Sequence, residues 1–182
     1  QALQQARLLG VAGKVDEAIA AYEKLYGGVP DDVDVAIEYW TLVARLPARH
    51  SEGVSQLKKL NASAPGNVSL LTSLAKQMFA DNKPQEGFAY LAEMARSASG
   101  RGIAADMWFS EVKSMPVSKA SVQALQQFLL QFPTGSVAAN ARVLLDQQQA
   151  QLQDPTFRAR SEGLAAVKSG NTSQAVADLQ KA

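Results

Sequence analysis

Cysteine is absent from this chain of 182 residues, and histidine occurs only at His50. Disulfides, thiolate zinc sites and cysteine nucleophiles are therefore excluded, and one histidine leaves little for a catalytic triad or a histidine-based metal site. No excess of one charge is present either, because 18 Lys and Arg balance 17 Asp and Glu. That balance predicts no strong attraction to nucleic acid or to anionic lipid.

Long apolar runs are also missing, since none reaches the roughly 18–20 residues that cross a bilayer. Aromatic residues make up only 7% of the chain, against 47% hydrophobic residues in all. This composition is typical of soluble helices. Because the chain starts at Gln1 without methionine, we expect a fragment or a processed product.

What the chain does contain is a repeat. Small residues recur 35, 34 and 34 residues apart, then once more after 54 residues, and one turn later each is followed by Tyr or Leu. The small positions are Ala18, Gly53, Gly87, Ser121 and Ala175. A period of about 34 residues is the signature of tetratricopeptide (TPR) repeats, which are pairs of helices that stack into a solenoid.

The pattern predicts an all-α fold, a TPR α-solenoid with a right-handed superhelix of about five helix pairs. The small residues are expected where paired helices approach closely, because a larger side chain would push them apart. Caps are predicted at Asp31 or Asp32, at Asn67 and at Ser118, and Asp154 with Pro155 reads as the start of another helix.

The interval of 54 residues breaks this register by 20 residues, about one helix with its turn. Residues 136–153 supply that helix, with Ser136 as the expected cap. We therefore predict a first TPR stack of four repeats over 1–133, an unpaired helix or hinge over 134–154 that redirects the stack, and the start of a second stack over 155–182. In the second stack, Gly163 and Gly170 join Ala175 as small residues, and Asn171 with Gln174 resembles a capping box.

Residues that suggest chemistry have plainer interpretations. Glu17, Glu52 and Glu86 recur at one repeat position, but each belongs to a separate repeat and suits a solvated first helical turn. Trp40 and Trp108 could stack on sugars, although their repeat positions favour the core. His50 lies beside Arg49 at a turn and is expected on the solvated surface. We predict no catalytic residue, no metal site, no cofactor and no enzymatic activity.

The remaining candidate is the inner surface of the stack, which the first helix of each pair lines. Eight side chains are predicted to point toward this groove: Arg7, Glu38, Arg45, Lys76, Phe79, Asp106, Lys113 and Arg160. Mixed charge with one aromatic ring suits a peptide, a protein segment or a polar polymer. The alternative is that these are ordinary solvated side chains.

Three stretches carry a family resemblance: QALQQARLL at residues 1–9, EYWTLVARLP at 38–47 and DPTFRARSEGLAAV at 154–167. They resemble the N-terminal region of the cellulose synthase operon protein C family, and the similarity extends through the whole chain. The resemblance implies a periplasmic TPR region, preceded by a signal peptide and followed by further repeats and an outer-membrane β-barrel. This fragment itself would not lie in the membrane.

The resemblance further implies a non-enzymatic scaffold for the synthesis and export of β-1,4-glucan. Its partners would be other subunits of the cellulose synthase complex and the glucan chain itself, with no nucleic acid. The alternative is a generic TPR adaptor of another bacterial complex. No catalytic residue is transferred from the family to this chain.

Overall fold

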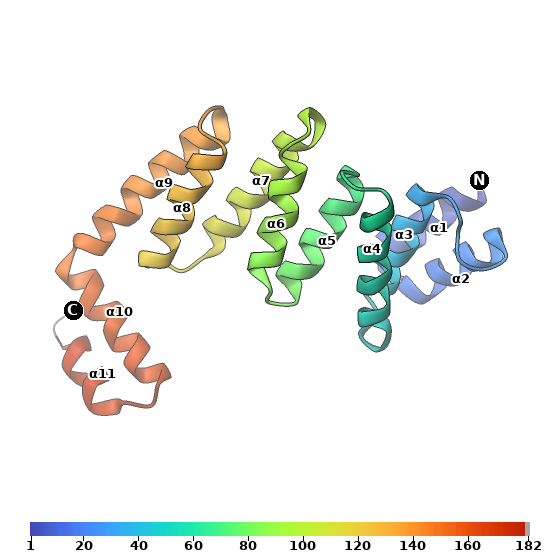
Figure 1. Ribbon diagram of the computed structural model, residues 1–182. Helices are drawn as coiled ribbons and strands as arrows, with labels where there is room; N and C mark the ends of the chain where they lie inside the picture. The colour runs from blue at the N-terminus through green and yellow to red at the C-terminus, as the bar shows by residue number, and fades with distance from the viewer. Residues whose placement is uncertain (181–182) are drawn as a thin grey trace. The chain divides into compact units, whose positions relative to one another are not determined.

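The computed structural model describes residues 1–180, and all regular structure in that range is helical. The helices are α1 (Ala2–Val11), α2 (Val15–Tyr26), α3 (Val33–Val43), the short 3-10 helix η1 (Pro47–Arg49), α4 (His50–Ser63), α5 (Val68–Ala80), α6 (Pro84–Met94), α7 (Ala98–Ser114), α8 (Lys119–Gln131), α9 (Ser136–Gln153), α10 (Pro155–Lys168) and α11 (Thr172–Leu179) (Figure 1). The predicted all-α repeat fold is confirmed.

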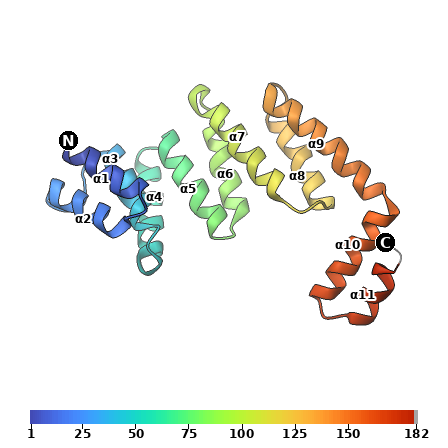
Figure 2. The same ribbon diagram turned by 180° about the vertical axis from the view of Figure 1, so that it is seen from behind.

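The helices form two compact units, unit 1 with residues 1–104 and unit 2 with residues 105–182. In unit 1, α1 packs on α2, α3 on α4 and α5 on α6, while α2 also contacts α3 and α4 contacts α5. In unit 2, α8 packs on α9, α9 on α10 and α10 on α11. Both views of the ribbon show this succession of neighbours within each unit (Figures 1 and 2). Contact between consecutive helices is the packing that a stacked repeat requires.

Helix α9 occupies the residues for which the sequence predicts an additional helix. The boundary between the two units falls at residues 104 and 105, within α7. The division into stacks at 1–133, 134–154 and 155–182, and the change of direction in the middle range, stay predictions. The last two residues of the predicted second stack, 181 and 182, lie outside the described residues.

Side-chain caps explain where several helices begin. In each case a side-chain oxygen accepts a hydrogen bond from a backbone N–H that the first turn leaves without a helical partner. Asp32 accepts from Val35, Asn67 from Leu70, Ser118 from Ser121 and Asp154 from Thr156. These are the capping residues that the sequence predicts, with Asp32 selected over Asp31.

Two other predicted caps differ from the structure. Ser136 is the first residue of α9, and Gly135 is its N-cap with a φ of 99°, a region that side-chain-bearing residues rarely adopt. At α11, Asn171 accepts from the backbone N–H of Gln174, but the side chain of Gln174 donates to Asp178 at 2.7 Å. The reciprocal half of that capping box is therefore replaced by a contact further along the helix.

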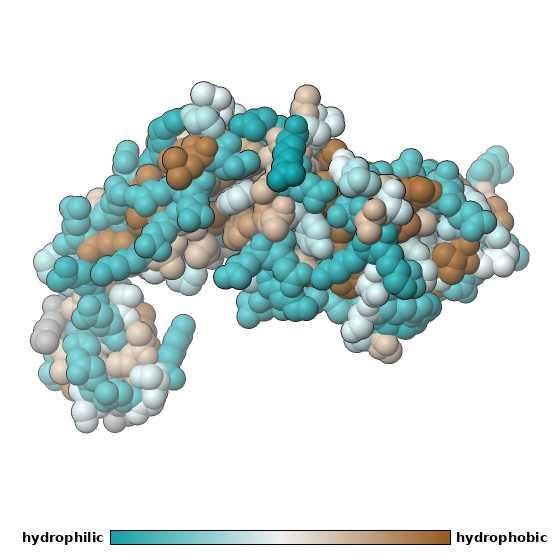
Figure 3. Space-filling model, viewed as in Figure 1, coloured by the Kyte–Doolittle hydropathy of each residue, from teal (hydrophilic) through white to brown (hydrophobic). Residues whose placement is uncertain are grey.

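Helix α3 lies at the centre of the core of unit 1. It is apolar on most of its circumference, with Val35, Ala36, Ile37, Tyr39, Trp40, Leu42 and Val43 all buried. Residues of the flanking helices, such as Tyr22, Leu57 and Leu74, complete this cluster. A helix that is apolar on nearly all sides must be surrounded by protein. On the outer surface, by contrast, apolar patches are small and separated by polar side chains (Figure 3).

The small repeat positions Ala18, Gly53, Gly87, Ser121 and Ala175 are all buried. A Cβ added at Gly53 would lie 2.4 Å from the backbone nitrogen of Ala44 at the end of α3, and one added at Gly87 would lie 2.7 Å from the ring of Phe79. Close approach of paired helices therefore accounts for glycine at both positions. Gly170 differs, because it is exposed and has a φ of 76°, which is a requirement of a turn.

Ser121 has a function beyond small size. Its hydroxyl donates to Gln148 Oε1 at 2.6 Å, and both side chains are buried between α8 and α9. Gln148 shares the buried face of α9 with Ala138 and Ala141. A polar residue in an otherwise apolar seam is stable only if it is hydrogen-bonded, so this pair determines how α9 is seated on α8.

Among residues 1–180, no helix combines the length and the apolar character needed to cross a membrane.

Candidate functional site

An inner recess of about 460 Å³ opens on unit 1 where α1, α3 and α5 face one another. These are the first helices of three successive pairs, which the repeat pattern assigns to the groove. Its lining consists of Arg7, Gly10, Val11, Tyr22, Ile37, Glu38, Thr41, Leu42, Arg45, Ser69 and Ser73. Three of the predicted groove residues, Arg7, Glu38 and Arg45, thus lie together here.

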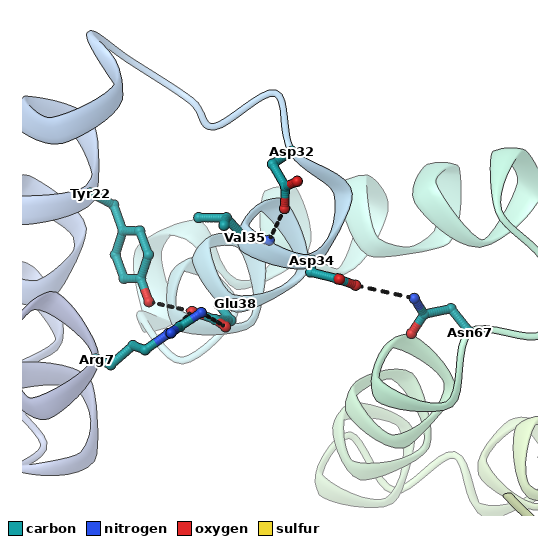
Figure 4. Close-up of polar contacts among 7 residues, drawn as sticks. All are labelled: Arg7, Tyr22, Asp32, Asp34, Val35, Glu38 and Asn67. Atoms are coloured by element: carbon teal, nitrogen blue, oxygen red, sulfur yellow. Dashed lines mark hydrogen bonds and ion pairs between the residues drawn. The ribbon is translucent and has the colours of Figure 1, made fainter. Parts of the chain in front are cut away.

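Glu38 is the centre of the polar contacts in the inner recess (Figure 4). Arg7 donates to both of its carboxylate oxygens, from Nε at 2.9 Å and from Nη2 at 2.8 Å. The hydroxyl of Tyr22 donates to Oε2 at 2.7 Å. The two parallel bonds from one guanidinium fix the orientation of the carboxylate, and the pair joins α1 to α3.

The pKa values of these three groups are shifted consistently. Burial is the largest influence on Glu38 and raises its pKa, but the hydrogen bonds from Arg7 and Tyr22 together bring that pKa below its ordinary value. The hydrogen bond to Glu38 raises the pKa of Arg7. Burial, followed by the bond to Glu38, raises the pKa of Tyr22. A cation, an anion and a neutral phenol therefore coexist at neutral pH.

A second tyrosine makes the reciprocal contact on the same pair of helices. Tyr22 of α2 donates to Glu38 of α3, while Tyr39 of α3 donates to Glu23 of α2, each at 2.7 Å. The two tyrosine rings meet edge to face, with centroids 6.4 Å apart. The dipeptides Tyr22-Glu23 and Glu38-Tyr39 therefore clasp α2 and α3 and hold one wall of the inner recess in place.

Arg45 occupies the other end of the inner recess. Its Nη1 donates to the backbone oxygen of Gly10 at 3.0 Å, so it links the ends of α3 and α1. A guanidinium has five N–H donors, and this contact uses one nitrogen on a neutral acceptor. Because Glu38 and Arg45 are seven residues apart, two helical turns place them on one face of α3.

Hydroxyl groups line the side of the inner recess that α5 forms. Thr41 of α3 donates to Ser73 of α5 at 3.0 Å, and Ser69 lies one turn before Ser73. Between the charged ends, the walls are the aliphatic side chains of Ile37, Leu42 and Val11. The arrangement can take up an extended segment with apolar and acidic groups.

The other predicted groove residues lie elsewhere. Lys76 is exposed on α5, and the ring of Phe79 packs on α6, edge to face with Phe88 at 5.1 Å. Asp106 and Lys113 are exposed on α7, and Arg160 is exposed on α10, all within unit 2. A role in binding stays a prediction for all eight residues.

Sequence reasoning did not place Tyr22, Thr41, Ser69 or Ser73 in the groove. Tyr22 occupies a repeat position that Leu fills in later repeats, and the hydroxyl that distinguishes it was a usable signal. Thr41 lies between Glu38 and Arg45 on α3, so the same helical face could have been extended to it. The two serines carry no distinctive spacing.

The recurring glutamates agree with the plainer interpretation. Glu17, Glu52 and Glu86 are exposed, and each pairs with its own cation: Lys14 at 3.1 Å, Arg49 at 2.8 Å and Lys58 at 2.8 Å. Within the described residues, acidic and histidine side chains form no cluster that could hold a metal ion. Trp40 is buried, and Trp108 is half-buried against Phe132, so both contribute to packing.

The expectation for His50 is wrong. Its ring is half-buried, with Nδ1 2.6 Å from the backbone oxygen of Ala44 and Nε2 2.8 Å from Asp81 Oδ1. The 3-10 turn at Pro47–Arg49 redirects the chain between α3 and α4 and places the imidazole over the ends of two other helices. Asp81 is 31 residues further along the chain, so neighbouring residues gave no sign of the contact.

Comparison with known proteins gives a consistent result. No protein-family model matches the chain. Cellulose synthase operon protein C is 50% identical over all 182 residues in Salmonella typhimurium and in Escherichia coli K12, where the chain covers 15% and 16% of the relative. The chain thus spans about a sixth of the length of these relatives. The counterpart from Xanthomonas axonopodis is 28% identical over 95% of the chain, and the chain covers 12% of it.

A solved structure supports the same assignment. The crystal structure of a flexible tandem repeat domain from bacterial cellulose synthase superposes with a TM-score of 0.73 at 51% identity, covering 85% of this chain and 63% of that one. The helical pairs, the small buried positions and the full-length identity agree with one another. The chain is therefore related over its whole length to cellulose synthase operon protein C, and it has the fold of a tandem repeat domain from that family.

Proposed function

We propose that the chain is a non-catalytic scaffold segment in bacterial cellulose synthesis and export, and that its inner recess binds a segment of a protein partner. The observation that carries this proposal is the gathering of Arg7, Glu38 and Arg45 around one apolar-walled recess, in a chain half identical to an operon protein named for cellulose synthesis. The partners would be other subunits of the cellulose synthase complex, and the compartment would be the periplasm.

The chemistry of the inner recess supports binding without catalysis. Its lining includes one carboxylate, Glu38, which is occupied by Arg7 and Tyr22. Cleavage of a glycosidic bond needs two carboxyl groups, separated by roughly 5–9.5 Å. A single anion in a salt bridge supplies neither the acid nor the nucleophile of that reaction.

The lining also favours protein over glucan as the ligand. Sugar rings are commonly bound on the open face of an aromatic side chain, and the aromatic residue of the inner recess is Tyr22, which is 1% exposed. The aliphatic wall and Arg45 suit instead an apolar side chain next to a carboxylate. An extended peptide carries both groups at short spacing.

Charge reversal at the inner recess tests the proposal. We expect Arg45→Glu, introduced into the corresponding segment of the relative in a cellulose-producing bacterium, to lower cellulose secretion by roughly tenfold, because reversing a contact charge costs several kcal/mol of binding. Secreted cellulose would be measured after enzymatic hydrolysis to glucose. Circular dichroism of the variant chain would establish that it still folds.

Arg96→Glu is the matched control, since Arg96 is exposed after α6 and outside the lining of the inner recess. Normal secretion is expected for this variant. Normal secretion from a folded Arg45→Glu variant, or equal losses from both variants, would contradict a role for the inner recess.

Titration with cellohexaose distinguishes the two ligand classes. We expect no saturable change in the amide NMR spectrum of the chain at ligand concentrations of about 1 mM, equivalent to a binding free energy weaker than about 4 kcal/mol. Saturable shifts confined to α1, α3 and α5 would instead identify glucan as the ligand of the inner recess.

A further inference from the structure

The imidazole of His50 lies where the ends of three helices meet in unit 1. His50 is the first residue of α4, Ala44 is the C-cap of α3, and Asp81 is the C-cap of α5. The ring is half-buried among them and lines a second, open recess with Lys58, Lys59, Asp81 and Lys83. One side chain therefore contacts the second and the third helix pairs at once.

Both ring nitrogens face acceptors. Nδ1 lies 2.6 Å from the backbone oxygen of Ala44, and Nε2 lies 2.8 Å from Asp81 Oδ1. A neutral imidazole has one N–H and one lone pair, while a carbonyl and an ionised carboxylate can only accept. A neutral ring would therefore direct a lone pair at one of the two oxygens. Only the doubly protonated ring can donate to both.

The surrounding charges favour that cation on balance. Asp81 is an anion in direct contact, and the carboxyl ends of α3 and α5 add the negative ends of two helix dipoles. Lys83 acts in the opposite direction, whereas Lys58 pairs with Glu86 at 2.8 Å and Arg49 pairs with Glu52. The contact with Asp81, then the bond to Ala44, raise the pKa of His50 above its ordinary value.

We propose that protonated His50 is a pH-sensitive clasp that ties the end of α3 to the end of α5. Because α3 and α5 also form two walls of the inner recess, the clasp regulates how firmly those walls are held, whatever the recess binds. In mild acid the ring bridges both acceptors. In mild alkali it loses a proton, and one of the two links becomes a contact between lone pairs.

The sign of the effect follows from linkage. A histidine whose pKa is higher in the folded state than the ordinary value of about 6.5 stabilises the fold fully below that value. The stabilisation is lost as the pH rises through the folded-state pKa. Unit 1 should therefore be more stable in mild acid than in mild alkali, by the contribution of this one group.

Because the chain has one histidine, its titration can be followed without assignment. We expect the imidazole carbon–proton signals to report a pKa above about 6.5 in the folded protein. Asp81→Asn, which keeps the shape of the partner and removes its charge, is expected to shift that pKa downward. A folded-state pKa at or below the ordinary value, or one that Asp81→Asn leaves unchanged, would overturn the proposal.

A stability measurement checks the same clasp independently. The thermal midpoint of the whole chain should fall between about pH 6 and pH 8.5, and His50→Gln should remove most of that fall. Glutamine can donate to one acceptor but does not titrate. An identical fall in wild type and His50→Gln would show that other groups cause the pH dependence, and it would also overturn the proposal.

Discussion

Gly53→Ala is expected to lower the free energy of unfolding of unit 1 by about 2–3 kcal/mol, as overpacking of a close helix contact does. The added Cβ would lie 2.4 Å from the nitrogen, 2.6 Å from the Cα and 2.8 Å from the Cβ of Ala44. Two of these are backbone atoms, so α3 and α4 themselves must separate. The better helix propensity of alanine, about 1 kcal/mol, offsets only part of the cost.

Urea denaturation of the chain would measure this loss, and Gly102→Ala is the matched control. Gly102 also lies within a helix of unit 1, but a Cβ there meets nothing within 4 Å. We expect the control to gain about 0.5–1 kcal/mol. Gly87→Ala should be intermediate, because the clashing group is the ring of Phe79, which can shift. Equal effects at Gly53 and Gly102 would contradict the close contact of α3 with α4.

The second large effect is expected at the buried hydrogen bond of unit 2. Ser121→Ala should cost about 2 kcal/mol, because the amide oxygen of Gln148 is left buried without its donor at 2.6 Å. The substitution also removes the acceptor that Ser121 provides for the backbone N–H of Ser118 in the capping box of α8.

A double-mutant cycle separates these two contributions. Gln148→Leu alone should cost less, because Ser121 keeps its contacts with Ser118. The double variant Ser121→Ala/Gln148→Leu should be more stable than the sum of the single losses predicts, by about 1 kcal/mol. Ser136→Ala at the exposed start of α9 is the control, with a change within about 0.5 kcal/mol. Strictly additive losses would mean that the two side chains do not depend on each other.

Much of the helical order could be predicted because its signals are local or periodic. Asp32, Asn67 and Asp154 are caps by the chemistry of their own side chains. Glycine at 53 and 87 recurs because each repeat meets the same close packing. Ser136 was mistaken for a cap because Gly135, with no side chain to signal it, could provide the turn through its backbone alone.

Half of the candidate site was also within reach of the sequence. Arg7, Glu38 and Arg45 follow from counting each first helix in the same way, and they line one recess. Phe79 was assigned by the same counting, yet its ring packs against α6, because an apolar ring gains more by burial than by facing the groove.

The sequence by itself determined the class of fold, the helix pairs and the residues that must be small, since each of these depends on composition, spacing and backbone conformation. Only the tertiary structure decided which distant side chains meet. His50 with Asp81, Ser121 with Gln148 and Tyr22 with Glu38 are contacts between different helices. Their formation depends on the angle and rotation at which neighbouring helices pack, and no local pattern records those quantities.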